Sequence, residues 1–176
     1  MQIVRRDVRI TLRAIGESIM VITKPTSFEV HAAFDATSIG TAVVCCSDGR
    51  FVGPMDEFLH QGLGIQRYDC LAVPGGAGCL AGHFAAWREE EAVSFQLKFL
   101  IEMHALHRIV LIAHPDCGFY SKRLRLFGSE IEEQERRDII TAAQRIRSLA
   151  PGLEIDAFIS RKLSSGMKFE AVNLAC

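Results

Sequence analysis

Two short stretches of the sequence place metal-binding side chains beside expected turns. Cys46 ends the apolar run at 41–46, and the stretch His114-Pro-Asp-Cys117-Gly follows the apolar run at 108–114. Proline and glycine within the second stretch favour a turn that aims its imidazole and thiol at one point. Thiolates and an imidazole are ligands that zinc accepts, and three protein ligands leave a fourth position for water or substrate. If the two runs are neighbouring parallel strands, these three side chains can form a metal site.

An acid and a guanidinium lie just beyond the first of these cysteines. Asp48 and Arg50 come two and four residues after Cys46, on the same expected turn, where they can pair with each other and reach the metal. We hypothesise that Asp48 accepts a hydrogen bond from metal-bound water, while Arg50 orients Asp48 and keeps it ionised. Asp48 could instead bind the metal directly and close the site.

The elements that must position these residues follow from the apolar pattern. Most of the apolar runs are continuous, as in strands that are covered on both faces, and four of them predict β-strands at 41–46, 68–73, 108–114 and 153–160. Apolar residues at helical spacing predict helices at 93–104 and 131–149, the second with a capping-box spacing at 129–132. Strands alternating with helices predict an α/β fold with a mainly parallel sheet flanked by helices. Ligands of such sheets bind at the carboxyl ends of the strands, where the candidate residues lie.

The domain organisation that we expect is one folded domain preceded by a short segment. Residues 41–176 are predicted to form a single α/β zinc-binding domain, and the chain of 176 residues is long enough to bury its own core. Residues 1–40 carry mixed signals, because alternating apolar residues near the start fit a strand whereas residues 14–22 fit a helix. For this N-terminal segment we expect a helical arm.

Composition and charge exclude several classes of protein. The 20 basic and 21 acidic residues are interspersed and give a net charge of −1, so we expect neither nucleic acid nor a membrane surface as partner. No segment reaches the roughly 18 apolar residues of a membrane span. The N-terminus is charged and lacks the apolar core of a signal peptide, so a cytoplasmic location is expected. Six cysteines at irregular spacing fit free thiols in a reducing compartment better than a disulfide framework.

Taken together, CSDGR at 46–50 and HPDCG at 114–118 resemble the paired motifs of the β-class carbonic anhydrases. That family has a Cys-x-Asp-x-Arg after one strand and a His-x-x-Cys-Gly after a later one. The resemblance extends from about residue 40 to the C-terminus. It departs from the family at Gly49, where a serine is usual, and in the glycine loop at 73–78, where the family commonly has an arginine and an asparagine.

The resemblance implies a fold, a cofactor and an activity. It implies a β-carbonic anhydrase-like α/β subunit that forms a homodimer or a multiple of dimers and holds one Zn2+ per subunit. It also implies that Cys46, His114 and Cys117 are the zinc ligands and that Asp48 and Arg50 are the catalytic dyad. The implied activity is that of a carbonate dehydratase, a zinc lyase that reversibly hydrates CO2 to bicarbonate and a proton by attack of zinc-bound hydroxide. Its partner would then be a small-molecule substrate, CO2 or bicarbonate.

Two further hypotheses keep the metal site but change its use. Because the glycine loop lacks the polar residues of the family, the chain could be a non-catalytic, zinc-binding carbonic anhydrase-like protein. The same residues could also hydrolyse a CO2 analogue such as carbonyl sulfide (COS) or carbon disulfide (CS2).

Two more hypotheses use different residues. Cys45 and Arg50 are spaced one residue short of the Cys-x5-Arg of phosphatases, and thiol chemistry there would leave the histidine motif without a role. The glycines at 76, 78 and 82 resemble part of a dinucleotide fingerprint, but the acidic residue expected after the next strand is missing, which favours a backbone turn. Alternation along a strand predicts that Cys45 faces the core on the side opposite Cys46. Cys70 and Cys79 are predicted to be core or loop thiols, and Cys176 an exposed terminal one.

Overall fold

The computed structural model describes residues 9–15, 18–24 and 27–174. The chain divides into two compact units, Met1–Ala36 and Thr37–Cys176. Among the described residues, no helix combines the length and the apolar character that crossing a bilayer requires. All the candidate site residues lie in the second unit.

The first unit contains a two-stranded antiparallel sheet, in which β1 (Arg9–Ile15) pairs with β2 (Ser18–Lys24). Here the structure differs from the helical arm that the sequence led us to expect over residues 1–40, of which residues 1–8 lie outside the described part. Both strands are rich in isoleucine, valine and threonine, whose branched side chains favour extended backbone over helix. Residues 27–38 form neither strand nor helix and are exposed.

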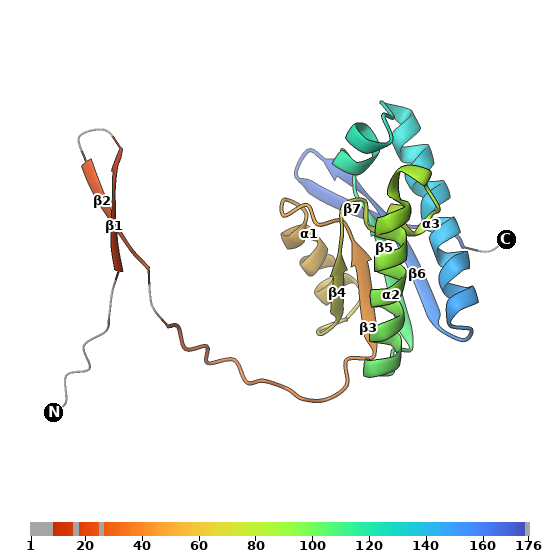
Figure 1. Cartoon of the computed structure of the whole chain (residues 1–176), viewed down its shortest axis with the longest axis horizontal. Helices are drawn as coiled ribbons and strands as arrows, with labels where there is room; N and C mark the ends of the chain where they lie inside the picture. Colours follow the sequence, from red (N-terminus) through yellow and green to blue (C-terminus); the bar gives the residue numbers. More distant parts are fainter. Residues whose placement is uncertain (1–8, 16–17, 25–26, 175–176) are drawn as a thin grey trace. The chain divides into compact units, whose positions relative to one another are not determined.

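The second unit is built on a five-stranded sheet with the order β4-β3-β5-β6-β7 (Figure 1). The four strands that begin the order are parallel, and the last one runs antiparallel to its neighbour. Their bounds are Thr41–Cys45 (β3), Asp69–Ala72 (β4), Arg108–Ala113 (β5), Glu154–Leu163 (β6) and Gly166–Ala171 (β7). The predicted α/β class with a mainly parallel sheet is therefore confirmed, and four of these strands lie where the sequence predicts them.

The helices of this unit are α1 (Val52–Glu57), α2 (Trp87–His104) and α3 (Ser129–Leu149). Short helical turns lie at Phe58–Gly62, Gly76–Leu80, Phe84–Ala86 and Phe119–Arg123. The capping box expected at the start of α3 does not form, because the N-cap is Gly128 and no side chain caps the helix. Glu130 instead accepts a hydrogen bond from the Phe127 backbone N–H at 3.2 Å.

Helices cover both faces of the sheet (Figure 1). On one face, α2 and α3 pack against alternate residues of the central strands, including Val44 and Leu111. On the other face, α1 and the turn after it pack against Val43 and Ile112. This arrangement explains the continuous apolar runs of β3 and β5, since every side chain along them is covered. The residues that follow these two strands are therefore positioned by a rigid, buried part of the sheet.

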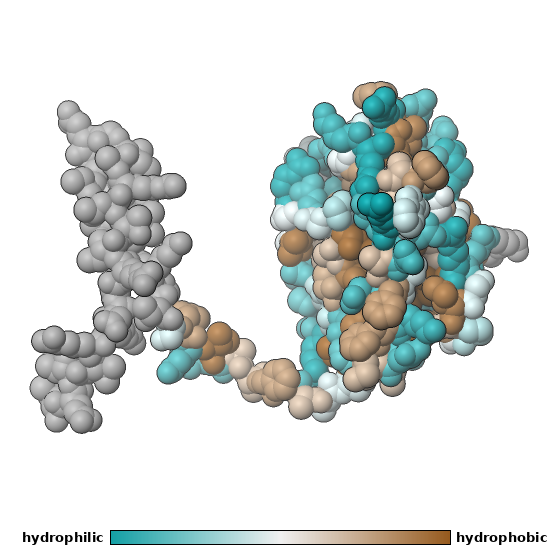
Figure 2. Space-filling model, in the orientation of Figure 1, coloured by the Kyte–Doolittle hydropathy of each residue, from teal (hydrophilic) through white to brown (hydrophobic). Residues whose placement is uncertain are grey.

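The outer side of α2 carries an apolar stripe. Phe95, Phe99 and Met103 are four residues apart and are all exposed, and brown side chains gather over α2 on the face shown in Figure 2. Residues at this spacing lie one above another on a helix. The helix therefore has apolar residues on its outer side as well as on the side that packs on the sheet.

Candidate metal centre

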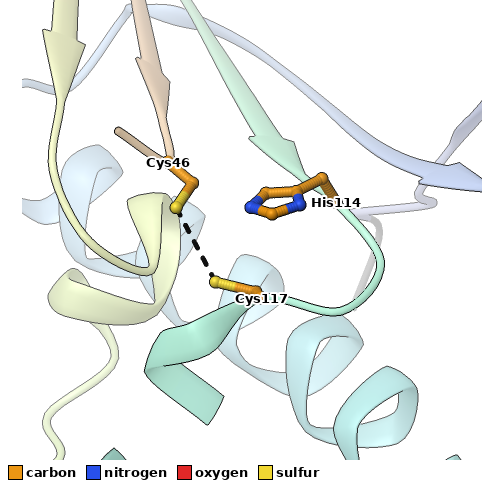
Figure 3. Close-up of side chains that lie close together, drawn as sticks. All are labelled: Cys46, His114 and Cys117. Carbon is orange, nitrogen blue, oxygen red and sulfur yellow. Dashed lines mark hydrogen bonds between the residues drawn. The ribbon is translucent and has the colours of Figure 1, made fainter. Parts of the chain in front are cut away.

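The predicted metal ligands come together at the carboxyl ends of two paired strands. Cys46 directly follows β3, and His114 directly follows β5, which is its parallel neighbour. Cys117 follows after a turn in which Asp116 adopts a positive φ of 58°. One ligand atom from each of the three side chains lies within 4.8 Å of the other two, and all three residues are buried (Figure 3).

The two sulfurs fit a metal ion better than a disulfide. The Sγ atoms of Cys46 and Cys117 are 3.7 Å apart, and both cysteines are free. A disulfide would bring the two sulfurs to about 2.05 Å. Two sulfurs that are each about 2.3 Å from a tetrahedral zinc ion lie about 3.8 Å from one another. The separation is therefore compatible with a shared zinc ion.

The imidazole presents the nitrogen that a metal needs. The Nδ1 atom of His114 lies 2.9 Å from the backbone oxygen of Pro115, so the Nδ1–H donates to that carbonyl. The other nitrogen, Nε2, is buried and has no hydrogen-bond partner within the described part of the chain. A buried nitrogen lone pair without a partner is costly unless something occupies it. Together with the two sulfurs, this donor set fits zinc.

The local electrostatics favour a negative charge on one of the two sulfurs, that of Cys46. The thiol of Cys117 donates to Cys46 and lowers the pKa of Cys46 to about 4, although burial opposes this shift. The Cys46 sulfur also accepts hydrogen bonds from the backbone N–H groups of Gly75 and Asp48. The pKa of Cys117 is raised, first by its hydrogen bond to Cys46 and then by burial. The pair thus shares one proton, which a bound metal ion would displace.

The pKa of His114 is shifted upward despite its burial. Burial is the largest single effect and lowers the pKa of His114, but the Cys46 sulfur, the Pro115 carbonyl and the Asp48 carboxylate all raise it, so the net shift is upward. Phe51 stacks on this imidazole with ring centroids 5.1 Å apart. The stacked ring and the Pro115 carbonyl together fix the orientation of the histidine.

The glycine loop between β4 and α2 packs its backbone against the end of β3, where Cys46 lies. Gly76 has a φ of +52°, and a Cβ atom there would lie 2.8 Å from the carbonyl carbon of Cys45 and 2.9 Å from the nitrogen of Cys46. A Cβ on Gly78 would lie 2.5 Å from the hydroxyl of Tyr120. Glycine at position 76 therefore lets the loop backbone approach the end of β3 closely. This use of the glycines agrees with the backbone turn that the sequence predicts.

The predicted dyad forms at the surface side of the centre. The Oδ1 atom of Asp48 accepts hydrogen bonds from the backbone N–H of Arg50 at 3.0 Å and from its Nε at 2.9 Å. The Oδ2 atom pairs with the Nη2 of the same guanidinium. The hydrogen bonds from Arg50 hold the pKa of Asp48 well below its usual range. This carboxylate is therefore ionised and engaged by the guanidinium.

A small cavity of about 140 Å3 lies between the dyad and the imidazole. Two of its lining residues, Lys162 and Met167, come from the β6–β7 hairpin and were not predicted from the sequence. Lys162 pairs with Asp116 and lowers the pKa of that carboxyl. Nothing in the local sequence around the ligands points to a lysine that is 46 residues away from its partner.

The other cysteines that the sequence singles out stand apart from this centre. Cys45 packs on the α1 side of the sheet, while Cys46 belongs to the α2 and α3 side, as alternation along the strand predicts. Cys79 is buried and donates to the backbone oxygen of Pro74 at 2.8 Å. Cys70 is exposed on β4, which corrects its prediction as a core or loop thiol.

Comparisons with known proteins identify a family and a relative. Residues 36–167 match the family described as "Putative carbonic anhydrase". An uncharacterized protein of Rickettsia bellii (strain RML369-C) is 25% identical over 125 residues, which are 68% of this chain and 74% of that protein.

Two solved structures of carbonic anhydrases are similar to this chain. Carbonic anhydrase from Streptococcus mutans superposes with a TM-score of 0.50 at 20% identity, over 81% of this chain and 89% of that one. β-Carbonic anhydrase isoform I from Trichomonas vaginalis gives a TM-score of 0.47 at 16% identity, over 80% and 87%. The carbonic anhydrase-like fold expected from the two motifs is confirmed. Since the matched region spans most of its length, the chain belongs to the putative carbonic anhydrase family.

Proposed function

We propose that this protein is a carbonate dehydratase that reversibly hydrates CO2 to bicarbonate and a proton, with one zinc ion per subunit. Cys46, His114 and Cys117 would hold the ion, and Asp48 with Arg50 would act beside it. One observation supports this most strongly: three buried donor atoms meet within 4.8 Å at the strand ends of a carbonic anhydrase family member. When bound, zinc would lower the pKa of a water ligand and so supply a nucleophile near neutral pH.

The role of the dyad in this proposal is to keep the fourth ligand position open. Arg50 engages both carboxylate oxygens of Asp48, so the carboxylate is not offered to the metal while this pair persists. Asp48 would instead orient a small polar ligand in the cavity as a hydrogen-bond acceptor. Arg50 is largely exposed whereas Asp48 is not, and both residues line the cavity.

The cavity suits a small substrate that gains charge on reaction. Its volume of about 140 Å3 is small, and its wall combines the apolar Phe51 and Met167 with the cationic Arg50 and Lys162. Apolar groups accept neutral CO2. Arg50 and Lys162 are paired with Asp48 and Asp116, so they would act on the anionic product as hydrogen-bond donors and not through an excess of positive charge. Carbonyl sulfide and carbon disulfide are linear triatomic molecules like CO2, so they are candidate substrates to be assayed beside it.

The first test is the zinc content of the purified protein, of Cys46→Ser and Cys117→Ser, and of Cys79→Ser as matched control. Cys79 is buried as the ligands are, but its thiol donates to a backbone oxygen outside the site. The parent and Cys79→Ser should each bind one equivalent of zinc, and the two ligand variants should bind little. Equal zinc in all four proteins would contradict the proposed ligand set.

The second test is stopped-flow CO2 hydration between pH 6 and pH 9. Two thiolates cancel the formal charge of the ion and weaken it as a Lewis acid, so the rate should rise toward alkaline pH. A flat profile would contradict this description. One equivalent of zinc without CO2 hydration at pH 9 would favour the non-catalytic hypothesis.

We also propose that the protein forms a homodimer or a multiple of dimers. Light scattering coupled to size-exclusion chromatography measures the mass that tests this.

A further inference from the structure

A second pair of thiols lies on the opposite face of the sheet from the metal centre. Cys45 on β3 and Cys70 on the neighbouring edge strand β4 place their Sγ atoms 3.8 Å apart, within hydrogen-bond reach. The register pairs Val43 with Cys70 and Cys45 with Ala72, so the two cysteines are diagonal neighbours on one face. The metal centre does not use either side chain.

The two thiols differ in their surroundings. Cys45 is 1% exposed in the core beside α1, whereas Cys70 is exposed. A buried apolar site disfavours the charged form of a thiol, and an exposed site does not. The exposed Cys70 is therefore the sulfur of the pair that a reagent can reach, and we assign the buried Cys45 thiol as the hydrogen-bond donor to it.

The hydrogen bond prepares Cys70 as a nucleophile. The bond from Cys45 lowers the pKa of Cys70 to about 7, against the opposing effects of partial burial and of the Asp56 carboxylate. The hydroxyl of Tyr68 donates to that carboxylate and so occupies one of its oxygens. A thiol whose pKa lies near the ambient pH is the best attacking group in thiol–disulfide exchange. Reactive cysteines are recognised by this combination of partial exposure and a lowered pKa.

The geometry does not favour a disulfide between the two cysteines themselves. In a parallel pair, strands lie about 4.8 Å apart and two residues span about 6.6 Å, so diagonal neighbours have Cα atoms about 8 Å apart. A disulfide spans about 4.4–6.8 Å between Cα atoms, so closing one here would require the strands to move. The pair is better suited to hold a thiol beside a thiolate than to become oxidised internally.

We propose that Cys70 is a modification site that is reversibly thiolated by low-molecular-weight disulfides, with Cys45 as its hydrogen-bond donor. The Cys70 thiolate attacks one sulfur of the small disulfide and forms a mixed disulfide with it. The sulfur–sulfur bond of the reagent breaks, and the leaving thiolate takes a proton from solvent. A free thiol reverses the reaction by the same exchange. The site is distinct from the metal centre and does not depend on the function proposed for it.

The test uses the full-length protein with glutathione disulfide at pH 7 and mass spectrometry that assigns each modified cysteine. Cys70 should react at least tenfold faster than Cys79, whose pKa is raised to about 11, mainly by burial. Dithiothreitol should restore the unmodified mass. A rate at Cys70 no greater than that at Cys79 would overturn the proposal. So would the loss of the Cys45 and Cys70 thiols together without any gain of glutathione.

Two substitutions test the role of Cys45. In Cys45→Val, which removes the donor, the midpoint of the pH profile for alkylation of Cys70 by iodoacetamide should move from about 7 toward about 8.5. The rate at pH 7 should fall about threefold, because the lower thiolate fraction is partly offset by a more nucleophilic sulfur. Cys45→Ser retains a donor and should retain most of the reactivity. An unchanged midpoint in Cys45→Val overturns the donor role. If that variant does not fold, a parent midpoint at or above 8.5 does so instead.

Discussion

Glu135 is a buried carboxyl group whose replacement should stabilise the protein in a pH-dependent way. It lies on α3, is 2% exposed, and its Oε1 atom has no hydrogen-bond partner among the described residues. Burial raises the pKa of Glu135 to about 8 from the ordinary value of 4.5, and His114 only partly opposes this shift. The perturbation that we choose is Glu135→Gln, which keeps the shape and removes the ionisation.

The size of the stability change follows from the difference between the pKa of Glu135 in the folded state and in the unfolded state. Between pH 4.5 and about 8 the folded state binds a proton at Glu135 that the unfolded state has lost. The free energy of unfolding of the parent should therefore fall by about 1.4 kcal/mol for each pH unit in this window. Over the whole window the loss is about 5 kcal/mol as an upper bound, because relaxation and water entry reduce it. The glutamine variant lacks this loss, and other titrating groups cancel in the comparison.

The assay is urea unfolding of both proteins, freed of metal by a chelator, at several pH values from 5 to 9. The stability difference in favour of Glu135→Gln should grow with pH and level off above about 8. Glu132→Gln is the control on the same helix. Arg161 lowers the pKa of Glu132, so this variant should be less stable than the parent near neutral pH, and the difference should vanish in acid. A difference between parent and Glu135→Gln that does not change with pH would refute the reasoning.

Two further predictions concern the support of the metal centre. Gly76→Ala should cost about 2–4 kcal/mol in urea unfolding and lower the zinc affinity at least tenfold, because its Cβ would meet the Cys45 backbone at a positive φ. Gly49→Ala, whose Cβ meets nothing within 4 Å, should change neither, and equal losses in the two variants would contradict the packing role. Phe51→Ala should cost about 3–5 kcal/mol, since the ring is 3% exposed and stacks on His114. Phe51→Leu should cost only about 1–2 kcal/mol by the same measurement, and a similar cost for both would argue against ring packing.

The sequence predicts the central part of the fold well because the signals there are local. The continuous apolar runs of β3 and β5 mark strands covered on both faces, and each run ends directly at a candidate ligand. Parallel neighbours bring their carboxyl ends to one edge, so Cys46 and His114 can be expected to meet. The turn residues after His114 then predict where Cys117 lies.

Other features depend on contacts that the sequence does not reveal. β7 is a short strand whose pairing with β6 forms a hairpin, and its residue Met167 reaches the cavity only because of that pairing. Lys162 and Glu135 lie far along the chain from the centre, and charged residues on a strand or helix are ordinarily expected to face solvent. In residues 9–24 the apolar pattern fits both a strand and a helix, and the branched residues of β1 and β2 decide in favour of strands.

The consecutive residues Cys45 and Cys46 connect the thiol pair on one face of the sheet with the candidate metal centre on the other through a single peptide unit. A peptide unit is rigid, and the unit between Cys45 and Cys46 has a sulfur-bearing residue at each end, one facing each side of the sheet. A small tilt of that plane must displace both sulfurs at once. A chemical change at the exposed thiol on β4 is therefore only one hydrogen bond and one peptide unit away from the sulfur that we propose as a zinc ligand.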